Sequence, residues 1–225
     1  MAALNAAQSE LVARWSAPDG LPFKGALISK KKGVTCMCAQ GQTLHYIGGW
    51  SFARLRKTGQ AEADIVTANL LDISRTHAVL LRIVNDGQPG APSAVLTDPE
   101  RVLGNNAPAV LAFWRHLDRM SADDWAAVRN ATSNTDDWLS AAKAVATVTG
   151  QTIKNTAVDV VWDAVAVACS NARTAAWDVG ACSVTSWATN EIQVAEIMAE
   201  RGQPLFFLRA FGFSTVASVL AAASK

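Results

Sequence analysis

The segment "AEADIVTANLLDISRTHAVLLRIVND", residues 61–86, predicts two helices joined by a short break. "EADIVTANLL" is typical of one helix, "DIS" interrupts it, and "RTHAVLLRIVN" is typical of the next. The second helix is apolar on nearly every side, and a helix that is apolar all round is buried in a core. We therefore predict that residues 75–84 form a buried helix. Its apolar residues are Ala78, Val79, Leu80, Leu81, Ile83 and Val84.

The same stretch, residues 61–85, also resembles the helix-turn-helix of DNA-binding proteins, in which the second helix enters the major groove. Asp72 stands where the tight turn usually has glycine. A recognition helix must keep one face for base edges, and only Arg75, His77 and Arg82 could serve there. A buried helical pair is therefore favoured, and DNA reading is the alternative.

Further helices are predicted on both sides of this pair. Residues 5–16 suit a short amphipathic helix, and residues 107–120 carry large apolar side chains at i, i+3, i+4 and i+7. Ser121 with Asp124 three positions later is a capping-box-like helix start. Residues 191–202 predict a helix that ends at a C-terminal glycine.

Three segments do not have a helical pattern. Residues 20–34 are predicted to be a short hairpin or an extended arm, and residues 86–94, with two Pro and two Gly, a loop. Residues 203–213, "QPLFFLRAFGF", are predicted to be a hydrophobic turn or short strand. The fold class is therefore mainly α, with at most a short hairpin.

Residues 122–190 are rich in alanine and spaced tryptophans. Small side chains at alternating four- and three-residue steps form a heptad seam, which allows close approach of helix backbones. We therefore expect residues 157–188 to be one helix packed lengthwise on other helices, partly between copies, with Trp162 and Trp177 at its edges. The seam residues are Val161, Val165, Ala168, Ala172, Ala175, Val179, Cys182 and Ser186.

The segment "VTCMCAQGQTLHYIGGW", residues 34–50, brings Cys36, Cys38 and His45 close together in sequence. A zinc site would need four ligands, and the Cys-x-Cys spacing is one residue tighter than usual, with no second pair nearby. A nucleophile would need a base and an orienting carboxylate. A redox pair would be strained at this spacing. A buried structural turn is favoured, because cysteine packs as a small hydrophobe. The partners for a nucleophile would be His77 or His116 with Asp98.

Charge is unevenly spread along the 225 residues, although the formal net charge is only +1. Residues 1–60 hold eight Lys/Arg against two acids, a net of +6, and the remainder sums to −5. Such a basic segment is favoured to be a solvated face, and binding to nucleic acid or to an acidic protein surface is the alternative. The chain divides into this basic segment, residues 1–60, and a helical core, residues 61–225, in what we expect to be one continuous domain.

The localisation expected from the sequence is a reducing compartment. The longest apolar runs fall short of the ~18 residues that span a bilayer, and the N-terminal residues lack the pattern of a secretory signal. Four cysteines are too few for a disulfide scaffold.

Four segments together resemble a family of short Ala/Trp-rich proteins of phages and prophages of proteobacteria. They are "CMCAQGQTLHYIGGW", "ISRTHAVLLRIVNDG", "DPERVLGNNAPAVLAFWRHLDRM" and "NEIQVAEIMAERGQPLFFLRAFGF". The family has no assigned activity, so the resemblance implies a phage setting and no catalytic residues. The middle of this chain is richer in Val, Thr and Asn than that of the family.

These observations favour a non-enzymatic phage structural or interaction protein, such as a virion or tail-associated component, without metal or cofactor. It would be found in the virion or the host cytoplasm and would bind copies of itself or other phage proteins. A phage effector that binds a host protein or nucleic acid is the alternative, and a Cys-dependent enzyme is the third hypothesis. The residues expected to contact a partner are Lys30, Lys31, Lys32, Arg54, Arg56, Lys57, Trp162 and Trp177.

Overall fold

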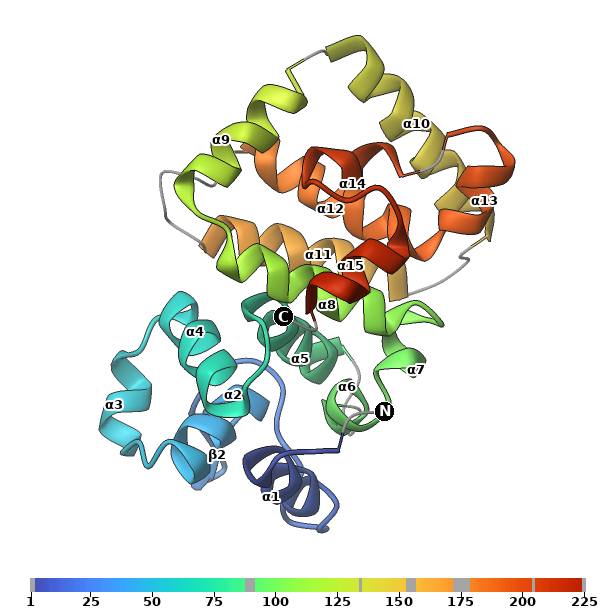
Figure 1. Cartoon of the computed structure of the whole chain (residues 1–225). Coiled ribbons are helices and arrows are strands. Elements are labelled where there is room, and N and C mark those ends of the chain that lie inside the picture. Colours follow the sequence, from blue (N-terminus) through green and yellow to red (C-terminus); the bar gives the residue numbers. More distant parts are fainter. Residues whose placement is uncertain are drawn as a thin grey trace. The chain divides into compact units, whose positions relative to one another are not determined.

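The computed structural model describes residues 3–87, 92–133, 135–152, 157–171, 179–203 and 205–223. The prediction of a mainly α protein with a single short hairpin is confirmed for these residues (Figure 1). The chain forms two compact units, Met1–Val102 and Leu103–Lys225.

The first unit contains the hairpin and the helical pair that the sequence predicts. Its elements are α1 (Ala6–Trp15), β1 (Ser29–Lys31), β2 (Val34–Cys36), α2 (Ala39–Gln42), the π-helix η1 (Thr43–Ile47), α3 (Phe52–Lys57), α4 (Gln60–Leu71), α5 (Arg75–Gly87), α6 (Pro92–Thr97) and the start of α7 (Pro99–Leu103).

Helix α5 is buried as predicted, with Ala78 to Leu81 all inaccessible to solvent. It packs against α2, α4 and α6, and Arg75, Arg82, Ile83 and Asp86 are its partly exposed side chains. Asp72 ends α4 in the left-handed conformation, with φ 50°, a conformation that Asp tolerates better than most residues. The end of α4 is also held by α1, because the Asn5 and Gln8 side-chain amides donate to the Leu71 carbonyl at 2.9 and 2.8 Å.

The second unit consists of helices. They are the end of α7, α8 (Ala107–Arg119), α9 (Ala122–Ala131), α10 (Thr135–Thr152), α11 (Ala157–Asn171), α12 (Val179–Gln193), α13 (Ala195–Glu200), α14 (Phe206–Ala210) and α15 (Val216–Ala223).

Helix α12 packs against α8, α9, α10, α11, α13 and α14, so it is the central helix of this unit. The buried Trp114 of α8 donates its indole N–H to Thr189 Oγ1 on α12 at 3.2 Å. Asn106, just before α8, donates to the Ile192 carbonyl at 3.0 Å. The capping box predicted at Ser121 and Asp124 is present at the start of α9.

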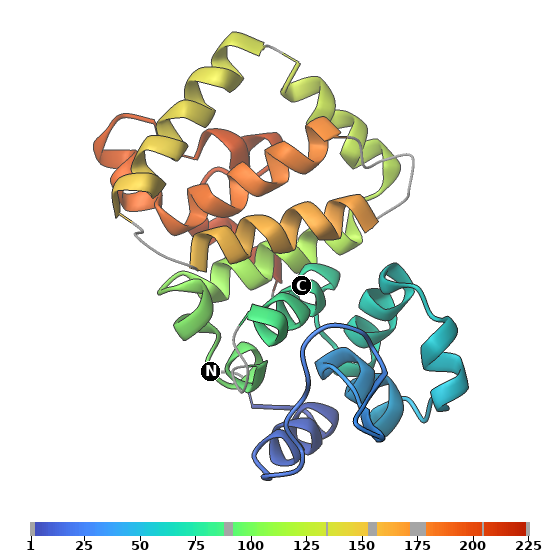
Figure 2. The same cartoon turned by 180° about the vertical axis from the view of Figure 1, so that it is seen from behind.

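The prediction of one helix over residues 157–188 is wrong. The segment contains two helices, α11 and α12, which pack against each other (Figures 1 and 2). The small seam residues Val161, Val165 and Ala168 are buried as expected. A heptad pattern does not distinguish one long helix from two that fold back on each other, because both bury the same stripe. The intermolecular part of the prediction stays a prediction.

Two predictions about the C-terminal part are also corrected. Residues 206–210 form helix α14 and not a turn or strand, since the apolar residues Phe207 and Leu208 reach the core from one helical turn. The helix expected over residues 191–202 is broken at Val194, between α12 and α13. The glycine end is confirmed: Gly202 has φ 69°, and the Gln203 N–H donates to the Met198 carbonyl at 3.0 Å.

Candidate functional site

The cysteine segment forms a tightly packed turn in the core of the first unit. Cys38 is the N-cap of α2, where its Sγ accepts the Gly41 N–H at 3.4 Å. Cys38 lies in a cluster of buried side chains with Leu27, Leu44 and Trp50. A side chain at Gly41 would collide with the Leu27 backbone, so the glycine allows the close approach.

The thiols of Cys36 and Cys38 and the ring of His77 are engaged in structural contacts. Burial raises the pKa of the Cys38 thiol, which favours the thiol over the nucleophilic thiolate. Cys36 is also buried and lies 3.6 Å from the Val34 carbonyl oxygen. His77 is buried, with Nε2 2.9 Å from the Val95 carbonyl oxygen, and so must donate through that nitrogen.

The other two candidate partners of a cysteine nucleophile are His116 and Asp98. His116 belongs to the second unit, where it packs edge-on against Phe213, and Asp98 is exposed between α6 and α7. Within the described ranges, no group of three or more His, Cys, Asp and Glu side chains could hold a metal ion.

His45 organises a set of aromatic rings beside this turn. Its Nδ1 lies 2.7 Å from the Trp50 carbonyl oxygen and therefore donates to it. Its ring lies 4.8 Å from that of Tyr46 and 4.7 Å from that of Phe52, measured between centroids. Tyr46 and Phe52 are 39% and 38% exposed, so two aromatic side chains are held at the surface by a half-buried histidine.

Two arginines lie over the aromatic rings of the same region. The Arg14 guanidinium carbon is 3.5 Å from the Tyr46 ring centroid, and that of Arg54 is 3.5 Å from the Trp50 centroid. Such cation–π contacts hold a long side chain in one place. Arg54 also lies 3.7 Å from Glu62, in an exposed ion pair.

We refer to this region as the basic aromatic surface. It has a hollow of about 370 Å³ on the side of α1, whose lining includes Glu10, Arg14, Asp19 and Tyr46. The basic aromatic surface consists of Arg14, His45, Tyr46, Trp50, Phe52, Arg54, Arg56 and Lys57.

Those predicted contact residues that the structure describes lie in three locations: helix α3, the hairpin and helix α11. Arg54, Arg56 and Lys57 are exposed on α3 within the basic aromatic surface. Lys30, Lys31 and Lys32 are exposed on the hairpin of the same unit, and residues 20–61, which contain both sets, hold seven Lys/Arg and no Asp or Glu.

The two predicted tryptophans do not join these groups. Trp162, on α11 of the second unit, is partly buried, with its ring edge-on to Trp187 at 4.5 Å. It is therefore a packing residue between α11 and α12. Trp177 lies outside the described residues.

Sequence reasoning missed Arg14, Tyr46, Trp50 and Phe52 as members of the site. The available signal was the run "HYIGGWSFARLRK", in which aromatic residues lead directly into a cluster of cations. Arg14 gave no such signal, because only the fold brings α1 to Tyr46.

Sequence reasoning also missed a buried carboxyl in the second unit. Glu191 of α12 has no solvent exposure, and its Oε2 accepts the Leu208 N–H at 2.9 Å. Burial raises the pKa of this carboxyl to about 7. Its engagement with the backbone of α14 makes it a structural tie between the two helices.

Comparisons with protein-family models, with curated proteins and with solved structures found no match to this chain. No helix within the described ranges combines the length and the apolar composition needed to cross a membrane.

Proposed function

We propose that the protein is a non-enzymatic interaction protein of a phage, part of the virion or of its assembly, that binds a partner through its first unit. The observation that carries the proposal is the basic aromatic surface. Its exposed rings, Tyr46 and Phe52, pack against His45, and two of its arginines lie over the rings of Tyr46 and Trp50. Aromatic residues and arginine are the side chains most enriched at the centres of binding interfaces.

The contacts of the cysteine segment support a binding role over catalysis. A cysteine nucleophile needs thiolate character and access to solvent, whereas the thiols of Cys36 and Cys38 are buried and burial raises the pKa of Cys38. His45 and His77 are engaged with backbone carbonyl groups. In this proposal the segment is the rigid base that presents Tyr46 and Phe52.

The phage setting is supported by the resemblance of the four quoted segments. Mass spectrometry of purified phage particles, from a lysogen that carries this gene, tests it. A virion component appears at a fixed ratio to the major capsid protein after density-gradient purification. A protein found only in the infected-cell extract, and never in the particles, contradicts the virion assignment.

The second candidate is a phage effector that binds a host protein or nucleic acid. It is favoured by the seven cations without a carboxylate in residues 20–61. The same particle analysis separates the two functions, because an effector is present during infection and absent from the virion.

A further inference from the structure

The hairpin of the first unit has a lysine at its tip, in an unusual conformation. Lys31 pairs with Val34, so the loop between the strands is the two-residue turn Lys32-Gly33. Lys32 has φ 49° and Gly33 has φ 82°. A turn with positive φ at both central residues favours Asn, Asp or Gly at the first of them. A lysine there is strained, and such strain is often kept where a side chain has a function.

The lysines on and beside the hairpin are not engaged in ion pairs within the described part of the chain. Lys24, Lys30, Lys31 and Lys32 are exposed, and within the described residues none of them forms an ion pair. By contrast, Arg54 and Arg82 of the same unit are paired with Glu62 and Asp64.

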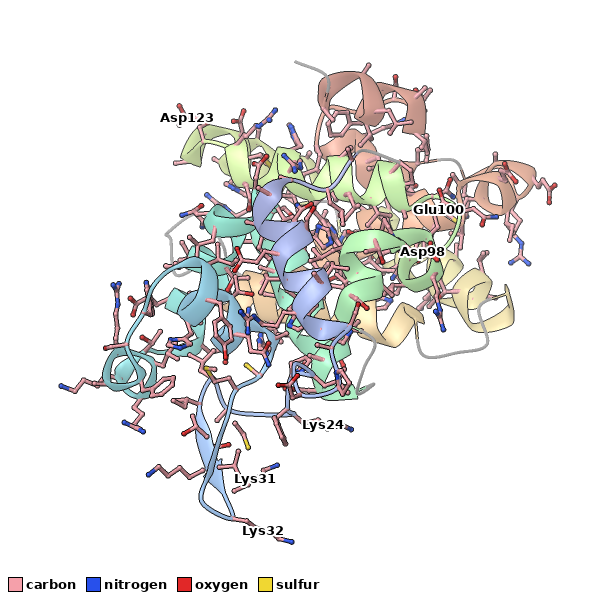
Figure 3. The ribbon with its side chains drawn as sticks, turned by 90° about the horizontal axis from the view of Figure 1, so that it is seen from below. Lys24, Lys31, Lys32, Asp98, Glu100 and Asp123 are labelled. Atoms are coloured by element: carbon pink, nitrogen blue, oxygen red, sulfur yellow. The ribbon has the colours of Figure 1, made fainter. Side chains whose placement is uncertain are left out.

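The part of the chain that forms the hairpin is uniformly basic, since residues 20–61 hold seven Lys/Arg and no Asp or Glu. Lys31 and Lys32 project from the end of the hairpin, with Lys24 on the adjacent loop (Figure 3). Asp98 and Glu100 lie on the opposite side of the unit, away from the hairpin (Figure 3). A partner with negative charge would therefore be attracted to the hairpin end.

The base of the hairpin is fastened to α5. Asn85 donates its side-chain amide to the Phe23 carbonyl at 2.9 Å, and Asp86 accepts the Gly25 N–H at 2.8 Å. Phe23 in turn donates its N–H to the Met37 carbonyl just after β2, at 2.9 Å. The lysines therefore project from an anchored base, which reduces the entropy lost when they bind.

We propose that the β1–β2 hairpin binds the sugar-phosphate backbone of a nucleic acid through Lys24, Lys30, Lys31 and Lys32, without reading base sequence. The inference goes beyond the proposed function, because it assigns a second kind of partner to a different surface of the first unit. Lysine contacts to phosphates supply sequence-independent affinity, whereas lysine is depleted at protein–protein interfaces. A nucleic acid also offers the uninterrupted negative charge that four unpaired lysines match.

The aromatic neighbour of the lysines fits the same partner. Phe23 is 43% exposed, and the Lys31 ammonium lies 5.7 Å from its ring centroid. An exposed ring between cations is a surface on which an unpaired base stacks. A two-stranded ribbon is also narrow enough for the major groove of a duplex. Single-stranded and duplex probes distinguish these two modes.

The test is fluorescence anisotropy of a labelled oligonucleotide, single-stranded or duplex, titrated with the full chain at several salt concentrations. The test variant is Lys31→Gln with Lys32→Gln. The control is Arg119→Gln with Lys143→Gln, which removes the same charge from exposed positions of the second unit. Each lost phosphate contact lowers the slope of log K against log salt by about 0.9 for duplex and about 0.7 for single strands.

We expect the hairpin variant to lose a slope of about 1.8 on duplex or about 1.4 on single strands, and the control to keep the wild-type slope. An equal loss in both variants would show that only net charge matters and would overturn the proposal. So would displacement of the oligonucleotide by polyglutamate at equal charge concentration, which would indicate an acidic protein partner.

Two further controls keep the result interpretable. Circular dichroism establishes that each variant is folded. If the double variant is not folded, Lys32→Asn replaces it, because asparagine suits the turn. A chain that binds no oligonucleotide, yet still crosslinks to a protein from position 52, contradicts this inference and leaves the proposed function standing.

Discussion

The guanidinium carbon of Arg54 lies 3.5 Å from the centroid of the Trp50 ring, directly above a side chain that is itself part of the core. This contact links the interior of the first unit to its basic aromatic surface. The same turn holds His45 against Tyr46 and Phe52. A surface built in this way is preorganised, which reduces the entropy lost on binding.

Replacing Lys32 by asparagine should stabilise the protein while weakening its binding to nucleic acid. Lysine at φ 49° is strained, and asparagine adopts this conformation more readily. We expect a gain of about 0.5–1 kcal/mol in the free energy of unfolding, measured by urea denaturation. Lys31→Asn, in the adjacent extended strand, should bring no gain. If Lys32→Asn destabilises the protein, the turn has been wrongly assigned.

Replacing Gly41 by alanine should unfold the first unit or weaken it severely. A Cβ there would lie 1.9 Å from the Leu27 carbonyl oxygen, so backbone must move. We expect a loss of about 3 kcal/mol, the upper end of the cost of overpacking. Gly59→Ala is the control, since nothing lies within 4 Å of its added Cβ, and it should cost about 1 kcal/mol or less as a weaker N-cap. Equal stability of the two variants would refute the close packing of the cysteine turn.

Replacing Ala164 by leucine should overpack the contact between α11 and α12. Ala164 has no solvent exposure, whereas Ala166 on the same helix is exposed. Leucine at position 164 should cost about 1–3 kcal/mol, and leucine at position 166 should change stability by less than about 0.5 kcal/mol. Thermal melting of both variants gives the comparison. If leucine at position 166 costs more stability than leucine at position 164, then Ala166, and not Ala164, is on the buried face of α11.

Stability should fall as the pH rises from about 4.5 to about 7 because of Glu191. Burial raises the pKa of this carboxyl from 4.5 to about 7, so the folded chain holds its proton more tightly than the unfolded chain. The contribution to stability is therefore complete below pH 4.5 and is lost as the pH approaches about 7. The loss is on the order of 3 kcal/mol.

Glu191→Gln isolates this effect, because glutamine keeps an oxygen acceptor for the Leu208 N–H and does not titrate. This variant is needed as a control because His116 also changes stability with pH. Burial lowers the pKa of His116, so this residue destabilises the folded protein as the pH falls, whereas Glu191 stabilises it. The free energy of unfolding of the wild type, measured relative to that of Glu191→Gln, should fall as the pH rises across this window. A constant difference would mean that Glu191 is not buried in the folded protein.

The helical pair of the first unit could be predicted from the sequence, because local patterns determine it. The apolar residues of α5 surround the helix, which by itself requires burial. The arrangement of α11 and α12 could not be predicted from the sequence. Val161 and Ala168 fit a heptad pattern equally well on a long helix or on one that folds back, and the choice depends on residues outside the pattern.

The candidate site, too, could be predicted only where its residues are close together in the sequence. Arg54, Arg56 and Lys57 form a visible charge cluster, so the sequence identified them. Arg14 is separated from Tyr46 by 32 positions and meets it only after α1 packs onto the unit. The positive φ of Lys32 could not be predicted from the sequence either, because lysine is disfavoured at this position of the turn.

The most direct test of the central claim is photo-crosslinking from position 52 in infected cells. A benzophenone amino acid replaces Phe52 in one variant and Leu139 in the other, side chains that are 38% and 42% exposed. The proposed function predicts one dominant crosslinked partner from position 52, lost when Arg54 and Lys57 are changed to glutamine, and none of that species from position 139. The same partner from both positions, or from position 139 alone, would contradict the assignment of the basic aromatic surface as the binding site.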